Sequence, residues 1–319
     1  MSLRIVSGQD EGLRRIRRGR GFEYRTADGV RITDETDLAR IRALAIPPAW
    51  RDVWICGYPN GHLQATGVDG AGRTQYLYHP EWAERAAQVK FDRALDLAQA
   101  LPRARASVTR DLRLGTPTRP TVLAAAFRML DAALLRIGSE AYAQEHGSIG
   151  LTTLRGSHAT IAAPVVSLRF TGKSSIAWET DIDDADLAAV LTVLRRRGAR
   201  RKLLSWRDEN RWRPLRPAEI NDDVRARTGG EFTAKDFRTI HGTVIAATSL
   251  ARSGVAETES ARNKAIRDAV VAAATALGNT PAVARSSYID PRLFEQYERG
   301  HIVRRDGPSV ERQLLDLLP

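Results

Sequence analysis

The sequence predicts an α+β fold: a small N-terminal domain built on an antiparallel β-sheet, and a larger, mainly α-helical domain that includes a small three-stranded sheet. Three observations lead to this prediction. Strand-like segments separated by turns fill residues 20–80, helical patterns dominate from Pro80 onward, and an alternating pattern returns within Ser157–Ile182. We expect the domains to cover residues 1–85 and 86–319. A chain of 319 residues is consistent with two domains, because about 150 residues per domain is usual.

The N-terminal strands are predicted from β-type segments placed around tight turns. FEYR and VRIT flank TADG, DVWICGY leads to PNG, and LQATGVD and TQYLYH flank DGAGR. One short helix, from about Glu35 to Leu44, ends before Pro47 and Pro48. The basic run RRIRRGR, Arg14–Arg20, precedes these segments, and we interpret it as a solvated charged face.

The second domain begins with the helical segment PEWAERAAQVKFDRALDLAQAL, which we expect to carry the link between the domains. A stripe at helical spacing then predicts a core-facing helix that ends near Gly138; it consists of Leu123, Phe127, Leu130, Leu134 and Ile137. HATIAAPVVSLRFTGKSSIAWETDI, within Ser157–Ile182, predicts three antiparallel strands. Helices are expected from there to the C-terminus.

The charge balance favours a polyanionic partner. Lys and Arg number 49 against 38 Asp and Glu, which gives a net charge of +11 and a pI near 10.3. DNA or RNA is the partner that we favour, with a membrane surface as the alternative. No run approaches the ~18 apolar residues of a membrane span, so we expect a cytoplasmic protein. Cys56 lies in an apolar run and the histidines are scattered, so no metal site is predicted.

Two segments could bind an anion. TGKSS places Lys173 in a tight turn between two strands, which alone is typical of a solvated hairpin lysine and not of a nucleotide-binding loop. TAKDFRTIHG opens a helix with a capping box of Thr233 and Asp236. Lys235 and Arg238 then lie on one face in its first two turns, where backbone N–H groups already favour a phosphate.

Three further residues have weak local signals. Arg136 precedes Gly138 at the expected end of a helix, where the dipole alone favours a cation. Tyr142 follows six residues later. Tyr288 in LGNTPAVARSSY, after a helix that starts at a Thr280 cap, would by itself be interpreted as a core tyrosine.

Taken in order, these motifs resemble the type IB DNA topoisomerases, and the small bacterial enzymes similar to the poxvirus topoisomerase above all. The matching segments are Arg136 in LLRIGSEAY, Lys173 in RFTGK, Lys235 and Arg238 in KDFRT, and Tyr288 in LGNTPAVARSSY. GHLQATGVDGAGRTQYLYHPEW, Gly61–Trp82, also resembles a signature of that family's sheet domain. The resemblance covers about residues 15 to 300.

The resemblance implies a fold shared with tyrosine recombinases and an enzyme that relaxes supercoiled duplex DNA without metal or ATP. Tyr288 would cut one strand and leave a 3′-phosphotyrosyl link, the duplex would rotate, and the free 5′-hydroxyl would reseal it. Arg136 and Arg238 would stabilise the charge of the transition state. Lys173 would supply a proton to the leaving oxygen, with Lys235 assisting or holding the phosphate; which lysine dominates stays open.

The remaining implied residues contact DNA or depart from the family pattern. Asn279 stands where most relatives have histidine; it can still donate a hydrogen bond but cannot titrate. Gln64, Tyr76 and Tyr142 are expected to contact DNA, the first two in the major groove. The implied partner is double-stranded DNA, bound by a monomer associated with the nucleoid, and no cofactor is expected.

Two other functions remain open from sequence. A tyrosine recombinase shares the catalytic fold, the arginine pair and the tyrosine, but usually has histidine where Lys235 stands and lacks the N-terminal sheet domain. A DNA-binding module without catalysis is the second alternative, and Asn279 is the one hint toward it.

Overall fold

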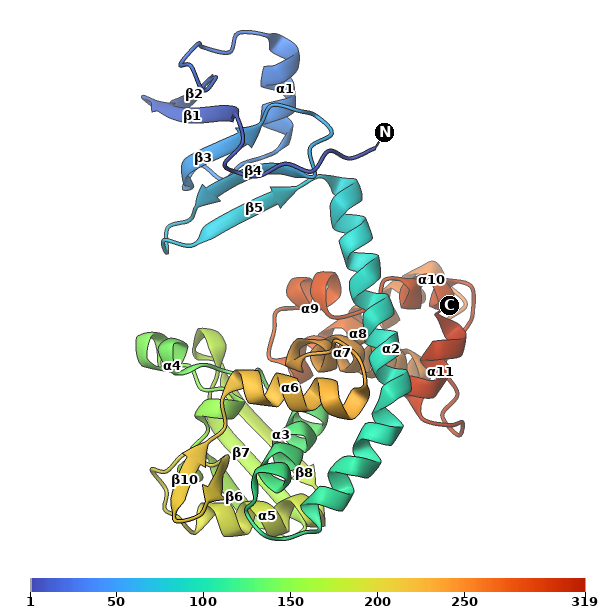
Figure 1. The fold of residues 1–319 in the computed structure, drawn as a ribbon. Coiled ribbons are helices and arrows are strands. Elements are labelled where there is room, and N and C mark those ends of the chain that lie inside the picture. Colours follow the sequence, from blue (N-terminus) through green and yellow to red (C-terminus); the bar gives the residue numbers. More distant parts are fainter. Residues whose placement is uncertain (1, 319) are drawn as a thin grey trace. The chain divides into compact units, whose positions relative to one another are not determined.

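The computed structural model describes residues 2–318, except for the side chains of Tyr142, His146 and Ser174. The chain forms two compact units that divide between Lys90 and Phe91. The division lies inside one continuous helix, α2 (Pro80–Leu112), whereas the sequence places it five residues earlier (Figure 1). A division within a helix leaves no mark in the sequence pattern, because the helical spacing continues through it.

The N-terminal unit is a five-stranded antiparallel sheet with one helix, as predicted (Figure 1). The strand order is β2-β1-β3-β4-β5, and α1 (Glu35–Ala43) begins at an Asp34 cap. The strands are β1 (Gly12–Arg18), β2 (Gly21–Arg25), β3 (Arg51–Cys56), β4 (Leu63–Val68) and β5 (Thr74–Tyr78). Its apolar core consists of Leu13, Ile41, Val53, Ile55 and Ala65.

One N-terminal prediction is confirmed and one is wrong in detail. The basic run is a solvated face at Arg14, Arg17, Arg18 and Arg20, and most of it forms β1, which pairs with both β2 and β3. Arg15 of this strand donates to the carbonyls of Ile46, Pro47 and Trp50, at 3.2, 3.1 and 2.7 Å. The predicted strand VRIT contributes one isolated bridge, between Arg31 and Arg25. FEYR forms β2, and β2 pairs with β1 instead of with VRIT. The hairpin therefore lies before β2 in the chain, and not at the expected turn TADG.

The second unit is mainly helical and holds the predicted three-stranded antiparallel sheet, in the order β6-β7-β8. Its strands are β6 (Ala159–Ala162), β7 (Val165–Thr171) and β8 (Ala177–Asp183). Three short 3-10 helices are η1 (Leu151–Thr153), η2 (Gly156–His158) and η3 (Lys173–Ser175). Its helices after α2 are α3 (Arg119–Ala133), α4 (Glu140–His146), α5 (Ala185–Arg195), α6 (Pro217–Thr228), α7 (Ala234–Ser253), α8 (Glu259–Leu277), α9 (Pro281–Ser287), α10 (Arg292–Glu298) and α11 (Val310–Leu317).

Two features of this unit differ from the prediction. A short hairpin, β9 (Ser205–Asp208) and β10 (Arg211–Pro214), interrupts the expected run of helices. Helix α3 also ends four residues before Ile137, because its C-cap Leu134 adopts the left-handed conformation, with φ of 55°. The left-handed turn changes the chain direction, so the loop that carries Arg136 does not continue along the axis of α3.

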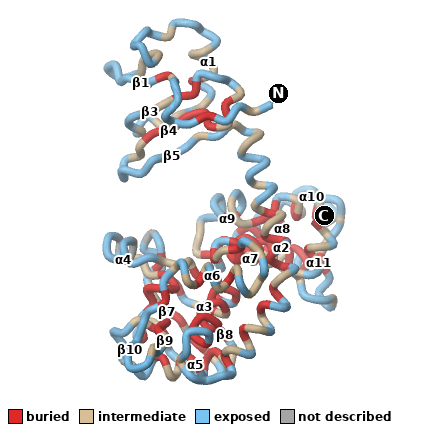
Figure 2. The backbone as a smooth tube through the Cα atoms, in the orientation of Figure 1, coloured by how far each residue is buried: buried red, intermediate tan, exposed pale blue. Residues whose placement is uncertain are grey.

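Helix α3 lies at the centre of the core of the second unit. Its turns from Val122 to Leu130 are buried apart from Arg128, which is half-buried, and Figure 2 shows this region in red. Phe127 meets Phe237 of α7 edge to face, with ring centroids 5.1 Å apart. Small alanines on the remaining faces let neighbouring helices approach closely. The end of α3 is therefore held firmly in place.

Asp184 joins α3 to α5 by a cap and an ion pair. Its carboxylate accepts from the Leu187 N–H at 2.9 Å, at the start of α5, and it also pairs with Arg128 of α3. The Asp184 and Arg128 side chains keep 11% and 21% of their exposure. Both interactions are thus partly shielded from water.

Asp184→Ala should lower the free energy of unfolding by about 2 to 3 kcal/mol, because it removes a helix cap and leaves a half-buried arginine without its carboxylate. The measurement is urea unfolding followed by far-UV circular dichroism, which reports the helical unit. Asp186→Ala is the control: Asp186 pairs with an exposed Arg113, so its loss should cost less than about 1 kcal/mol. Equal losses for the two variants would contradict the prediction.

Candidate active site

Helix α7 begins as the sequence predicts. The Asp236 carboxylate accepts from the Thr233 N–H at 2.8 Å and from its hydroxyl at 2.9 Å. Arg93 of α2 donates to the same carboxylate at 2.5 Å, and Asp236 is buried. The predicted capping box is confirmed, and it fixes the first turn. Lys235 lies exposed in that turn.

Arg238, one turn further, is buried and joins two other helices. Its Nη1 donates to the Leu134 carbonyl at 2.6 Å and its Nη2 donates to the Leu277 carbonyl at 2.7 Å, at the C-terminal ends of α3 and α8. Burial above all, together with the charge of Arg136, lowers the pKa of Arg238 to about 10. The guanidinium therefore stays protonated near neutral pH, and it lies 5.0 Å from the centroid of the Tyr288 ring.

Arg136 lies in the loop after α3, not in the last turn of the helix as expected. Its Nη2 donates to the Asn279 side-chain oxygen at 2.6 Å. Burial lowers the pKa of Arg136 from its usual value. The loop is closed by two glycines: a Cβ on Gly138 would lie 2.9 Å from the Cα of Gly150, so the two backbones touch. The Leu151 N–H then donates to the Arg136 carbonyl at 2.9 Å.

Asn279 follows the left-handed Gly278 that ends α8. A Cβ on Gly278 would lie 2.6 Å from the Trp178 ring, so only glycine fits at this turn. Because an arginine can only donate, the bond from Arg136 assigns the Asn279 oxygen to that side. Its Nδ2 is buried and has no hydrogen-bond partner within the described part of the chain. A buried amide N–H without a partner is costly, so an acceptor that reached this position would be favoured.

Tyr288 ends the short helix α9. As predicted, α9 starts at a Thr280 cap, whose hydroxyl accepts from the Val283 N–H at 3.4 Å, with Pro281 in the first turn. Tyr288 is half-buried, whereas the next two residues, Ile289 and Asp290, are buried. The structure therefore brings Tyr288, Arg238, Arg136 and Asn279 into one connected group.

Two residues that hold Tyr288 were not predicted from the sequence. Gly242, one turn after Arg238 in α7, leaves room for the tyrosine backbone: a Cβ there would lie 2.3 Å from the Tyr288 carbonyl oxygen. The buried Thr243 hydroxyl accepts from the Asp290 N–H at 3.0 Å and lies 3.5 Å from the same carbonyl. The glycine in TIHG was a visible signal, but its neighbour is 46 residues away, so the sequence did not indicate what it contacts.

Lys173 lies in η3, in the turn between β7 and β8, which confirms the predicted hairpin position. The residue is exposed. A hollow of about 400 Å³ brings it near the group above, since both Arg136 and Lys173 line it, together with Gly138, Ser148 and Pro217 among others. Lys173 and Arg136 therefore line one hollow, although they come from different loops.

The chain matches two protein-family models and a known relative. Residues 80–302 match the family described as "Eukaryotic DNA topoisomerase I, catalytic core". Residues 21–69 match "Bacterial DNA topoisomerase IB, N-terminal domain". A relative named DNA topoisomerase 1B, from Acanthamoeba polyphaga mimivirus, is 30% identical over 295 residues, which cover 90% of this chain and 88% of the relative.

The chain belongs to the type IB DNA topoisomerases. It is therefore an isomerase that acts on DNA, and the resemblance stated from the sequence is confirmed. The fold class is confirmed as well. The six candidate residues of this topoisomerase all lie within the matched catalytic core; they are Arg136, Lys173, Lys235, Arg238, Asn279 and Tyr288.

The three expected DNA-contact residues have different positions. Gln64 is buried, and its amide donates to the carbonyls of Tyr58, Pro59 and Gly61, at 3.2, 3.0 and 2.7 Å. It supports a turn, so the expectation that it reaches into a groove is not met in this structure. Tyr76 is 52% exposed and stacks on Tyr78. The side chain of Tyr142 lies outside the described residues.

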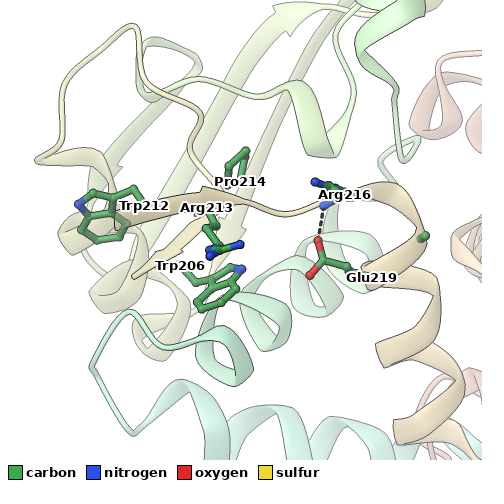
Figure 3. A pocket seen from close by; sticks show the side chains of 7 residues that line it. Trp206, Trp212, Arg213, Pro214, Arg216 and Glu219 are labelled. Atoms are coloured by element: carbon green, nitrogen blue, oxygen red, sulfur yellow. Dashed lines mark hydrogen bonds between the residues drawn. The ribbon is translucent and has the colours of Figure 1, made fainter. Parts of the chain in front are cut away.

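Among the side chains that the structure describes, no His, Cys, Asp or Glu residues gather in a set of three or more that could hold a metal ion. No described helix has the length and apolarity to cross a membrane. Figure 3 shows a separate hollow of about 430 Å³ beside the β9–β10 hairpin, lined by Trp206, Trp212 and Arg213 among others. None of the six candidate residues lines it.

Gly242→Ala should slow the relaxation of supercoiled DNA by about 10²-fold, because the added methyl displaces the Tyr288 backbone by a large fraction of an ångström or more. DNA affinity should be unchanged. The measurement is the initial rate of relaxation at saturating enzyme, with a gel-shift titration for binding. Gly70→Ala is the control, since a Cβ at Gly70 meets nothing within 4 Å. Parent-like relaxation by Gly242→Ala would show that the contact is tolerated.

Proposed function

We propose that this topoisomerase relaxes supercoiled duplex DNA by cutting and resealing one strand through a 3′-phosphotyrosyl intermediate at Tyr288. The observation that carries the proposal is the connected group around this residue. Arg238 lies beside the Tyr288 ring, and Arg136 donates to Asn279. The bonds from Arg238 to the carbonyls of Leu134 and Leu277 hold the helix ends that precede Arg136 and Asn279. Nucleophile and cations thus come from distant parts of the chain to one place.

In the cleavage step, the Tyr288 oxygen bonds to the scissile phosphorus and the bond from phosphorus to the 5′-oxygen breaks. The phenol proton passes to solvent water, and the 5′-oxygen takes a proton from a general acid of the enzyme. Negative charge grows on the non-bridging oxygens, where guanidinium donors stabilise it. Arg238 uses two of its five N–H groups on helix carbonyls, and its Nε is buried without a hydrogen-bond partner among the described residues, which leaves this N–H for a phosphate oxygen.

Asn279 completes the donor set. The bond from Arg136 to the Asn279 oxygen fixes the orientation of the amide. The Nδ2 of the same amide has no hydrogen-bond partner among the described residues. We propose that it donates to a non-bridging oxygen, as histidine would, but takes no part in proton transfer because an amide does not titrate. Acid–base chemistry therefore falls to the lysines.

Lys173 is the proposed general acid for the 5′-oxygen. An ammonium can release its proton, whereas a guanidinium practically cannot. Lys173 shares a hollow with Arg136, which supports its access to the same phosphate. Lys235, in the exposed first turn of α7, is assigned to holding the phosphate or assisting this transfer.

The reaction exchanges one phosphodiester for another, so it needs neither a nucleotide nor a metal ion. The religation step is the reverse attack by the 5′-hydroxyl, which frees Tyr288. We propose duplex DNA as the substrate, with the protein acting as a monomer. Steep weakening of DNA binding with salt should accompany the net charge of +11.

Relaxation of a supercoiled plasmid in EDTA without ATP tests this function. The expected result is a ladder of topoisomers that ends in relaxed plasmid. A tyrosine recombinase would not unwind the plasmid processively, and an inactive DNA-binding protein would leave it supercoiled. Either of those results would overturn the proposal.

Tyr288→Phe should bind DNA like the parent but form no covalent adduct, because the ring stays and the nucleophilic oxygen is lost. The measurement is denaturing gel electrophoresis of enzyme mixed with labelled duplex, which detects protein joined to DNA. Tyr297→Phe is the control, since the Tyr297 hydroxyl is committed to the Gly254 carbonyl at 2.9 Å, and it should still form the adduct. An adduct in Tyr288→Phe would place the nucleophile elsewhere.

Lys173→Ala should slow cleavage by about 10²-fold or more, because the 5′-oxygen must then leave without a proton. A substrate with sulfur in place of that bridging oxygen needs little acid, so parent and Lys173→Ala should cleave it at nearly equal rates. Arg136→Ala should stay slow on it, since that residue acts on other oxygens.

The matched control for Lys173→Ala is Lys264→Ala, an exposed lysine that pairs with Asp268, which should cleave both substrates like the parent. If sulfur does not rescue Lys173→Ala, the lysine positions the DNA and the proton comes from another group, with Lys235 the next candidate.

A further inference from the structure

A buried charge cluster joins four helices of the second unit, and we call it the Asp131 cluster. It consists of Arg105 in α2, Asp131 in α3, His241 in α7 and Glu311 in α11. Arg105 donates to both oxygens of Asp131, at 2.8 and 2.9 Å, and His241 Nε2 lies 2.9 Å from Oδ1. Arg105 also donates to Glu311 at 2.9 Å. No residue of the cluster lines the hollow shared by Arg136 and Lys173.

The Asp131 carboxylate keeps its charge although its side chain is only 7% exposed. Burial acts to raise the pKa of Asp131, but the bonds from His241 and Arg105 outweigh burial and hold it well below its usual range. A buried charge resists any movement that separates it from its partners, because separation leaves it unpaired. The cluster is therefore a rigid joint.

The position of the joint relates it to the two arginines. Asp131 lies three residues before Leu134, and His241 lies three residues after Arg238. Since Arg238 also bonds the Leu134 carbonyl, polar bonds tie α3 and α7 together at two points about one turn apart on each helix. One such bond leaves the helices able to pivot about it, whereas two fix their angle.

We propose that Asp131 and His241 are positioning residues for strand cleavage, which hold the ends of α3 and α7 so that Arg136 and Arg238 keep the spacing that the scissile phosphate requires. The inference rests on the proposed function, because it takes both arginines as phosphate-binding. The two residues act through the arginines and do not touch the DNA. Glu311 extends the joint to α11 through Arg105 and contributes less.

The first test replaces His241. His241→Phe keeps a ring but removes the donor, and it should slow covalent adduct formation in a single turnover at saturating DNA by about 10²-fold, the scale of a displacement near 1 Å. His241→Gln keeps an N–H donor and should recover most of the rate. DNA affinity should match the parent in both. His301→Phe, at an exposed histidine, is the control and should leave the rate unchanged.

A double-mutant cycle separates positioning from general support of the fold. In an Arg136→Ala background there is no pair of arginines left to align, so His241→Phe should slow the residual rate by less than about twofold, which is the scatter expected between sites that do not interact. All rates are measured well below the unfolding temperature of each variant. If the slowing stays the same in the Arg136→Ala background, the positioning role is overturned.

Asp131→Asn gives an independent variant in case His241→Phe fails to fold, because the amide keeps the volume but cannot accept both bonds from Arg105. It should show the same loss in the parent background and the same disappearance of that loss in Arg136→Ala. Glu311→Gln should slow the reaction by a smaller factor than Asp131→Asn, and its control is the exposed Asp316→Asn on the same helix.

A parent protein that forms no adduct would overturn the proposed function. An active parent matched in rate by both His241→Phe and Asp131→Asn would overturn the positioning role alone.

Discussion

The guanidinium of Arg238 bonds the final carbonyls of two helices, and the arrangement of the site follows from those two bonds. Carbonyls at helix C-termini carry partial negative charge, so a buried cation between two of them is stabilised without a carboxylate. A carboxylate there would neutralise the guanidinium and repel DNA. The left-handed residues that end these helices, Leu134 and Gly278, then turn Arg136 and Asn279 toward each other. One side chain thus aligns the loops that carry the others and keeps its charge.

Local features of the site were predictable because their causes are local. Thr233 and Thr280 are helix caps whose partners lie three residues away, and Lys173 lies in a turn defined by its own two strands. Gly242 and Gln64 were missed or misplaced for the opposite reason. The contact of Gly242 with the Tyr288 backbone depends on how two distant helices pack. The resemblance placed Gln64 in the major groove, but the sequence does not show the turn carbonyls that its amide bonds. The resemblance to a family predicted that these residues belong to one site, whereas hydrophobic periodicity alone gave no reason to group them.

The arginine content also has a structural explanation that composition hides. Several guanidinium groups bond backbone carbonyls or carboxylates and are only partly exposed. Arg15 donates to three carbonyls, Arg105 to two carboxylates, and Arg197 to backbone carbonyls near the start of β9. Burial lowers the pKa of Arg15 and Arg197, as it does for Arg136. Net charge therefore overstates the cation density available to a polyanion, and the same residue type serves both folding and substrate binding.

The contact between Gly138 and Gly150 has a consequence for how the chain can vary. The Leu151 and Thr152 N–H groups donate to the Arg136 and Ile137 carbonyls and close the loop at its base. The two ends of the segment between Gly138 and Gly150 are therefore held together. Lengthening a loop whose ends are already held costs only about 0.6 kcal/mol for each doubling. Residues inserted into this segment away from Ser139, Ser148 and Ile149, which line the hollow shared with Lys173, should therefore leave Arg136 where it is.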